Sequence, residues 1–255
     1  MARTPQNSAE SRALPFWRNH RWRIGLWLTL FPFLLELHTY PIRFGMLRLA
    51  MLLAAMALWG GAFLLFRYRP MRCAWLAVTL PTVLWLASPG QPLDASELRY
   101  AYSDTLIRYD GTPYVWGGET RRGIDCSGLV RAGMVDALLQ QGCHRRNPRA
   151  IREAAILWWD DCSARELGRQ YHGRTRVLYE VPNLNRLDYN KLVNGDFAVT
   201  TSGVHTLAFL GGHTWIEADP SLPNGDRVIT VGVPTSNPWF RMPMRIVRWR
   251  YLDAG

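Results

Sequence analysis

Cys126 is the residue of this chain whose type and position most directly suggest covalent chemistry. It follows Asp125, and apolar residues then recur at helical spacing until Gly142. Asp is a favoured N-cap residue, so Asp125 is predicted to cap a helix whose first turn holds Cys126. The positive end of a helix dipole favours a thiolate at that position. The segment therefore predicts a nucleophile, although a small buried apolar cysteine is the ordinary alternative.

His205 supplies a base that could activate such a thiol. It opens a predicted strand, 204–210, and a returning strand, 214–218, carries Glu217. A histidine takes the proton of a thiol and returns it to a leaving amine, while an acceptor on its second nitrogen fixes the ring. Together with Cys126, these residues make a nucleophile, a base and an orienting group.

The loop between the two strands decides whether these groups meet. A three-residue loop centred on Gly211 would place positions 205 and 217 directly opposite each other, with both side chains on one face. A two-residue loop would place Ala218 opposite His205 instead. Asp219 lies on the same strand face as Glu217 by the period of two, and it is the alternative acceptor.

Four short segments resemble the NlpC-type family, the papain-like cysteine peptidases of bacterial cell walls. They cover roughly residues 95–220, and the cysteine block is the most specific of them: Tyr114-Val115-Trp116-Gly117-Gly118, Asp125-Cys126-Ser127-Gly128-Leu129-Val130, Asn194-Gly195-Asp196-Phe197, and His205 with Leu207-Ala208-Phe209-Leu210-Gly211. The resemblance implies Cys126 as nucleophile and His205 as base, with Tyr114 and Ser127 on the oxyanion or substrate side. It places the third polar member about a dozen residues after the histidine, at Glu217.

Three features depart from the family pattern. The third member is usually His, Asn or Gln rather than Glu. The family more often has a small Gly where this chain continues with histidine after Val204. His205 lies 79 positions beyond Cys126, a longer gap than the family leads one to expect. The extra residues are predicted as an insertion around 143–186, helical over 147–170, which could lie over the cleft and narrow its entrance.

The first third of the chain has a different composition. The 255 residues carry a net charge of +10, but residues 1–88 hold ten arginines and only two acidic residues. The rest is nearly balanced, which argues against nucleic-acid binding by the whole chain. Residues 1–23 are predicted as a basic tail, and 24–88 as a membrane anchor of two or three transmembrane helices from three apolar runs: 24–35, 47–66 and 73–87.

The arginines predict how this anchor is oriented. Three of them lie in the link 67–72 and five in the tail 1–23, so both segments are expected on the cytoplasmic side. This places residues 89–255 outside the cytoplasm of a bacterial inner membrane crossed more than once. The first run is short and is followed by Glu36 and His38, so whether it spans stays open. A cleaved signal peptide fits poorly because the apolar runs are too long and too many.

Together these features predict an α+β chain: a transmembrane helical anchor followed, over 89–255, by a papain-like NlpC-type domain whose cysteine helix packs on an antiparallel sheet. The expected activity is hydrolysis of amide bonds in peptidoglycan stem peptides, which the family implies beside D-glutamate and a diamino acid. The expected partners are those peptides and the lipid bilayer. No cofactor is expected, and no metal-ligand spacing is present.

Two other functions and one covalent link remain open. The same three groups could serve a thiol amidase or acyltransferase acting on lipid or other amides, or the domain could be a catalytically decayed wall-binding scaffold. Cys143 and Cys162 both fall in the presumed extracytoplasmic part, where an oxidising compartment would permit a disulfide.

Overall fold

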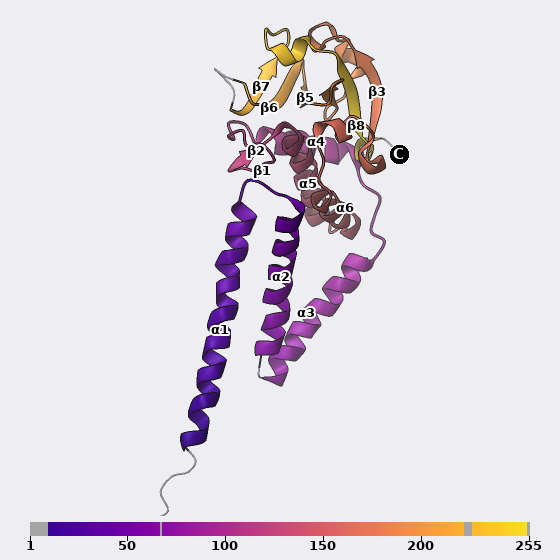
Figure 1. Ribbon diagram of the computed structural model, residues 1–255. Helices are drawn as coiled ribbons and strands as arrows, with labels where there is room; N and C mark the ends of the chain where they lie inside the picture. Colours follow the sequence, from indigo (N-terminus) through magenta and orange to yellow (C-terminus); the bar gives the residue numbers. More distant parts are fainter. Residues whose placement is uncertain (1–9, 67, 222–225, 254–255) are drawn as a thin grey trace, which may run out of the picture. The chain divides into compact units, whose positions relative to one another are not determined.

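The computed structural model describes residues 10–66, 68–221 and 226–253, so the first nine residues of the predicted basic tail lie outside the described part. The chain forms two compact units. The first comprises helix α1 (Glu10–Thr39) and residues Met46–Leu80. The second comprises Tyr40–Gly45 and the chain from Pro81 onward, including all of the strands (Figure 1).

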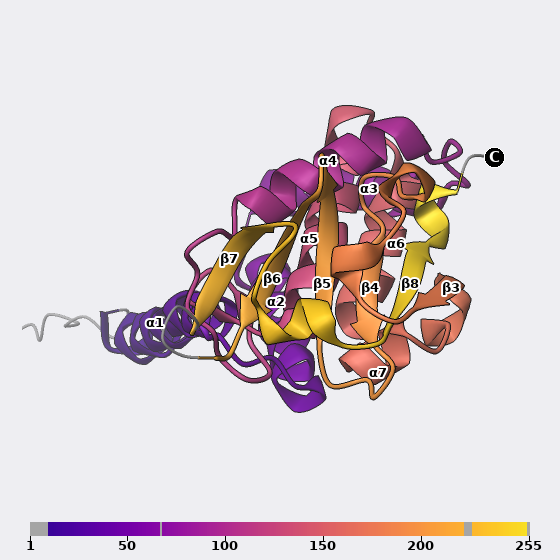
Figure 2. The ribbon, with the colours of Figure 1, turned by 90° about the horizontal axis from the view of Figure 1, so that it is seen from above.

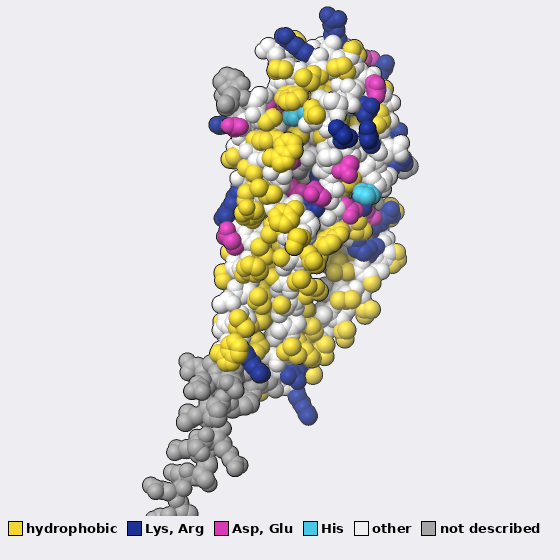
Figure 3. Space-filling model, in the orientation of Figure 1, with side chains coloured by type: hydrophobic (Ala, Val, Ile, Leu, Met, Phe, Trp, Pro, Cys, Tyr) yellow, Lys and Arg dark blue, Asp and Glu magenta, His cyan; other side chains and the backbone are white. Residues whose placement is uncertain are grey.

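The first unit is built from strongly apolar helices. Among the described residues, two helices are long and apolar enough to cross a membrane: α2 (Gly45–Leu65) and α3 (Arg69–Ala87). Their surfaces are covered with exposed hydrophobic side chains (Figure 3). The indole of Trp27 in α1 donates a hydrogen bond to the carbonyl of Leu58 in α2 at 2.9 Å. Trp59 packs on Trp75 of α3 with ring centroids 5.3 Å apart.

The second unit contains a six-stranded antiparallel sheet with the order β3-β8-β4-β5-β6-β7 (Figure 2). The strands are β3 (Thr175–Val181), β4 (Phe197–Thr200), β5 (Thr206–Gly211), β6 (Thr214–Asp219), β7 (Arg227–Gly232) and β8 (Met244–Trp249). Two short strands, β1 (Glu119–Thr120) and β2 (Gly123–Ile124), pair with each other just before the cysteine helix.

The α-helices from α4 to α7 each begin at a side chain that caps their free N–H groups. Asp94 caps α4 (Ala95–Ile107), and Asp125 caps α5 (Cys126–His144), the helix that carries the cysteine. Asn147 caps α6 (Pro148–Trp159), whose first residue is proline. Ser163 and Glu166 form a complete capping box on the short α7 (Ala164–Leu167).

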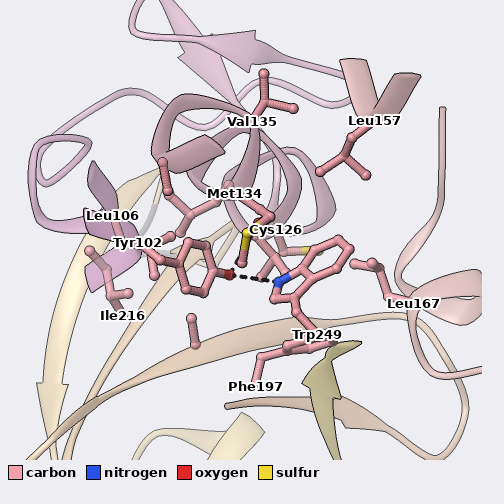
Figure 4. Packing of buried hydrophobic residues seen from close by; sticks show 14 of the residues in the cluster. Tyr102, Leu106, Cys126, Met134, Val135, Leu157, Leu167, Phe197, Ile216 and Trp249 are labelled. Atoms are coloured by element: carbon pink, nitrogen blue, oxygen red, sulfur yellow. Dashed lines mark hydrogen bonds between the residues drawn. The ribbon is translucent and has the colours of Figure 1, made fainter. Parts of the chain in front are cut away.

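The main core lies between these helices and one face of the sheet (Figure 4). Tyr102 of α4 and Trp249 of β8 are both fully buried there, and the indole of Trp249 donates to the hydroxyl of Tyr102 at 3.4 Å. A second cluster, around Trp215 and Phe240, covers the opposite face of the sheet. Side chains that alternate along each strand therefore enter one cluster or the other, and this burial on both faces fixes the register of the strands.

The sheet differs from the sequence prediction in extent. The sequence prediction does not include β3 and β7. β3 lies in the arginine-rich stretch that was assigned to the insertion. β8 pairs with β3 on one side and with β4 on the other. The last strand in the sequence is therefore interior to the sheet, and its burial comes from these two neighbours.

The predicted register of the β5–β6 hairpin is wrong in both of its forms. The observed pairs are Ala208 with Ile216 and Phe209 with Trp215, and then a shift leads to Gly211 with Thr214. The turn is therefore Gly212-His213, both at positive φ, next to a bulge at Leu210. The bulge gives the hairpin a form that differs from both predicted loops, and the observed register places Leu207 rather than His205 opposite Glu217.

Candidate active site

The Asp125 side chain builds the turn on which Cys126 stands. One carboxylate oxygen accepts the N–H of Gly128 at 2.6 Å and the hydroxyl of Ser127 at 2.9 Å. The other oxygen accepts the N–H of Gly117 at 2.8 Å. Burial raises the pKa of Asp125, and these hydrogen bonds oppose that rise. The cap thus joins the start of α5 to the loop that precedes it, as the sequence predicted for the helix start.

Gly128 permits a close backbone approach beneath the cysteine. A Cβ atom built on it would lie 2.2 Å from the carbonyl oxygen of Gly118, a distance at which the backbone must move. The Gly118 carbonyl also accepts the N–H of Asp125 at 3.1 Å. The glycine in the motif is therefore needed so that α5 can begin against this loop. Cys126 itself is a free thiol with 7% of its surface exposed.

His205 and Glu217 contact each other inside the protein. The Nε2 atom of His205 lies 2.7 Å from Oε2 of Glu217, and the two residues are 1% and 0% exposed. Continuing the β5–β6 register places Glu217 opposite Leu207, so its contact with His205 is diagonal across the ladder. Because Nε2 is used by Glu217, Nδ1 is the ring nitrogen left for the thiol.

The surroundings of His205 favour its protonated form. Burial alone would lower the pKa of the ring, but hydrogen bonds to Cys126 and Glu217, together with their charges, raise it to about 10. These interactions link the three side chains in one unit. An imidazolium held between a thiolate and a carboxylate is the charge arrangement that a cysteine nucleophile needs.

Two residues that the sequence did not single out complete this group. Asn237 donates a hydrogen bond from Nδ2 to Oε1 of Glu217 at 2.7 Å. Trp239, in the short helix η4 (Pro238–Arg241), stacks on the His205 ring with centroids 4.2 Å apart. Asn237 also accepts the N–H of Trp239 at 3.0 Å, so its side chain is bonded to both Glu217 and Trp239, which each contact the His205 ring. The pair Asn237-Pro238, which is typical of a helix start, is the sequence feature that could have identified this segment.

The other predicted site residues lie close by in distinct settings. Asp219 accepts hydrogen bonds from Ser221 and from the indole of Trp239 at 3.2 Å, whereas the hydrogen-bonding acceptor on the His205 ring is Glu217. Tyr114 runs beside β2, and burial, followed by the charge of Cys126, raises its pKa. The Ser127 hydroxyl is occupied by Asp125.

Cys126 and His205 line one cleft of about 1020 Å³, whereas Glu217, Asp219 and Asn237 do not line it. It is lined by Cys126, His205 and Tyr114, and by the exposed ring of Trp116 and the half-buried ring of Trp239. A further wall is the segment 161–166, which lies within the stretch predicted as an insertion. The stretch predicted as an insertion therefore supplies one side of the cleft.

A buried arginine on the cysteine helix holds this wall in place. Arg131 donates to the carbonyls of Leu157 at 3.1 Å and Asp160 at 2.9 Å, at the end of α6, and forms an ion pair with Glu119. Its guanidinium thus caps the C-terminus of α6 and sets where residues 161–166 begin. Cys162 in this wall and Cys143 on α5 are free thiols, and the disulfide considered between them is not formed.

The site can support acyl transfer through a thiolate, with a base that is already positioned and a helix start facing the reacting carbon. Within residues 10–66, 68–221 and 226–253, three or more His, Cys, Asp or Glu side chains are nowhere grouped so that they could hold a metal ion.

Comparison with known proteins agrees with this arrangement. Residues 111–223 match the model of the NlpC/P60 family. A stretch of 34 residues is 56% identical to the "Probable endopeptidase NlpC" of Escherichia coli strain K12, covering 13% of this chain and 22% of that relative. This chain thus aligns with only about a fifth of that relative's length.

Two solved structures are among those to which this chain is similar over part of its length. One is the NlpC/p60 domain of the peptidoglycan hydrolase SagA, at 22% identity and a TM-score of 0.35, covering 58% of this chain and 97% of that one. The other is NlpC2 from Trichomonas vaginalis, at 15% identity and a TM-score of 0.40, covering 65% and 50%. The family match includes Tyr114, Cys126, His205 and Glu217, while Asn237 and Trp239 lie beyond it. Residues 111–223, which include Cys126 and His205, form a domain of the NlpC/P60 family, a family of cysteine hydrolases that includes cell-wall endopeptidases.

Proposed function

We propose that this protein is a membrane-anchored cysteine peptidase that hydrolyses amide bonds in peptidoglycan stem peptides. The observation that carries the proposal is the connected group of Cys126, His205 and Glu217, in which Cys126 and His205 line one cleft and Glu217 is buried behind the histidine. Family membership supports the substrate class, because the family acts on cell-wall peptides.

In this proposal the Cys126 thiolate attacks the carbonyl carbon of the scissile amide. The proton taken from the thiol resides on Nδ1 of His205, and the imidazolium returns it to the leaving amine as the tetrahedral intermediate collapses. A thioester remains on Cys126. His205 then removes a proton from water, which attacks the thioester and releases the acid and the free thiol. Glu217 holds Nε2–H throughout and stabilises the charged ring.

The negative oxygen of the intermediate needs donors on the cysteine side of the cleft. Cys126 is the first residue of α5, so the first N–H groups of the helix lie beside the thiol, and Tyr114 lines the same cleft. Burial keeps the Tyr114 phenol protonated by raising its pKa, so it can donate a hydrogen bond at neutral pH. We assign Tyr114 to this role. Ser127 acts through the Asp125 cap that its hydroxyl joins.

The cleft favours a peptide over a lipid acyl chain. Charged side chains of Asp161, Arg165 and Glu166 line one wall, together with the carboxylate of Asp125 near the thiol. An apolar entrance would suit a fatty acyl amide better, because a charged wall must lose water without gaining a partner. A decayed scaffold is less supported, because the nucleophile, base and orienting group are all in contact.

The two apolar helices support anchoring in a membrane. α2 and α3 each have the length and composition to span, and Arg69 and Arg72 lie where the chain passes from one to the other. Arginines at such a link favour the cytoplasmic side, which puts the hydrolase unit on the opposite side, next to the wall polymer.

The test uses the full-length protein in detergent micelles. It is incubated with purified muropeptides, and the products are read by mass spectrometry. We expect a shortened stem with a new free amine, lost with Cys126→Ala and retained with Cys143→Ser, which removes an exposed thiol outside the cleft. Cleavage of lipid amides but not of stems would favour the amidase alternative. A folded protein that cleaves neither, with a Cys126 unreactive to iodoacetamide, would overturn the proposal in favour of a binding role.

A further inference from the structure

Charged groups of the cleft are almost all paired within the protein. Asp125 accepts two hydrogen bonds from its own turn and one from the preceding loop, and Asp161 accepts the N–H of Cys162 at 2.9 Å and contacts Arg131 at 3.5 Å. Glu166 accepts the N–H of Ser163 at 2.7 Å. The carboxylates of the wall are thus used to hold the wall, and they leave little capacity for a ligand.

Arg165 is the exception. It lines the cleft and is exposed, and in the part of the chain that the structure describes no side chain forms an ion pair or hydrogen bond with its guanidinium. A guanidinium offers five N–H donors in a planar fork that matches a carboxylate. Among the described residues that line this cleft, it is also the only arginine or lysine.

The position of Arg165 is close to the catalytic histidine. A Cβ atom built on Gly203, two residues before His205, would lie 2.7 Å from Cβ and 2.9 Å from Cγ of Arg165. The stem of the arginine therefore packs directly against the loop that delivers the base. Gly203 has φ +78 and tolerates this packing because it lacks a side chain. The backbone below Arg165 is fixed by the capping box of α7.

From these observations we infer that Arg165 binds a carboxylate on the substrate residue next to the scissile amide. This inference rests on the proposed function and specifies its substrate class. When glutamate is linked through its γ-carboxyl group, its α-carboxylate stays free beside the amide bond. A stem with this free carboxylate would pair with Arg165, whereas a stem in which it is converted to a carboxamide would not.

The carboxylate and the carboxamide have nearly the same shape, so the two stems differ chiefly in charge. The three carboxylates around the cleft would repel an anionic substrate unless a cation compensates for them. Arg165 supplies that compensation at a defined position. Charge-assisted bonds are about twice as strong as neutral ones, so a preference of about tenfold in kcat/KM is expected for the free acid.

The experiment compares two synthetic stem tripeptides that differ only in this group, carboxylate against carboxamide. The full-length protein, Arg165→Gln, Arg165→Lys and Arg169→Gln are assayed in micelles at two salt concentrations. Arg169 is the matched control, because it is an exposed arginine four positions away that does not line the cleft.

We expect the native protein and Arg169→Gln to prefer the carboxylate about tenfold, with the preference falling at high salt. Arg165→Gln should reduce the ratio to about one, and Arg165→Lys should keep part of it because the charge remains without the fork. Equal cleavage of both stems by the native protein, or an unchanged ratio in Arg165→Gln, would overturn this inference while leaving the peptidase proposal intact. Cleavage of neither stem by a folded native protein would instead contradict the peptidase proposal itself.

Discussion

Asn237 donates a hydrogen bond, at 2.7 Å, to Oε1 of Glu217, the carboxylate oxygen that does not contact His205. Glu217 is fully buried, so this donor and the histidine ring are the two partners that balance its charge. Asn237→Ala should therefore weaken the charged Glu217–His205 pair and lower kcat/KM by about tenfold to a hundredfold, the range for a hydrogen bond to a charged group. The measurement is kcat/KM across pH, in which the basic limb should move to lower pH.

Asn185 is the matched control for this substitution. It bonds the backbone of Thr235 in both directions, at 3.0 Å each, and so holds the same loop without touching Glu217. Asn185→Ala should lower the thermal stability and leave the pH limits of activity in place. If both variants gave the same pH profile, Asn237 would have only a structural role.

The raised pKa of His205 predicts where activity ends at high pH. The ring must carry a proton for the leaving amine, so kcat/KM should fall only as the pH rises through the raised pKa, well above the ordinary value of 6.5. Glu217→Gln removes the neighbouring negative charge, which lowers the pKa of His205 and moves this limb to lower pH. Asp219→Asn should leave the limb in place, because Asp219 bonds Trp239 rather than the ring. If Asp219→Asn moved the basic limb and Glu217→Gln did not, Asp219 rather than Glu217 would be the acceptor that acts on the His205 ring.

Gly128 gives a prediction whose sign depends on tertiary structure. Helix propensity alone would make Gly128→Ala stabilising by up to about 1 kcal/mol. The Gly118 carbonyl, 2.2 Å from the added Cβ, predicts the opposite, a loss of roughly 1–3 kcal/mol from overpacking. Thermal unfolding measures the effect, with Gly232→Ala as control, because a Cβ there meets nothing within 4 Å. A variant at Gly128 that is as stable as the native protein would contradict the close approach.

The proposed topology can be tested with single-cysteine variants in spheroplasts. Tyr68→Cys places a thiol at the exposed link between α2 and α3, and Cys143 is an exposed thiol of the hydrolase unit. A membrane-impermeant maleimide should label the Cys143 variant and not the Tyr68→Cys variant, which should react only after lysis. Labelling of both thiols, or of Tyr68→Cys alone, in intact spheroplasts would exclude a cytoplasmic link with an external hydrolase.

The local features of the site followed from the sequence because they depend on neighbouring residues. The Asp125 cap, the start of the cysteine helix and the strands around His205 are set by capping preference and by periodicity, which act over a few positions. Motif order then predicted Cys126, His205 and Glu217 together. The prediction of Glu217 as the partner agrees with the observed contact, but the register by which it was reached was wrong, because a bulge at Leu210 is not visible in the pattern.

What only the tertiary structure decided depends on residues distant in the sequence. The terminal strand β8 lies inside the sheet because β3 and β4 pair with it from both sides. Asn237 and Trp239 reach the base from a loop beyond β7, and Arg131 fixes the end of α6 from the middle of α5. Such contacts join segments whose individual patterns do not encode their meeting. The sequence determined which groups could react, and packing determined which residues hold them, pair their charges and leave Arg165 free in the cleft.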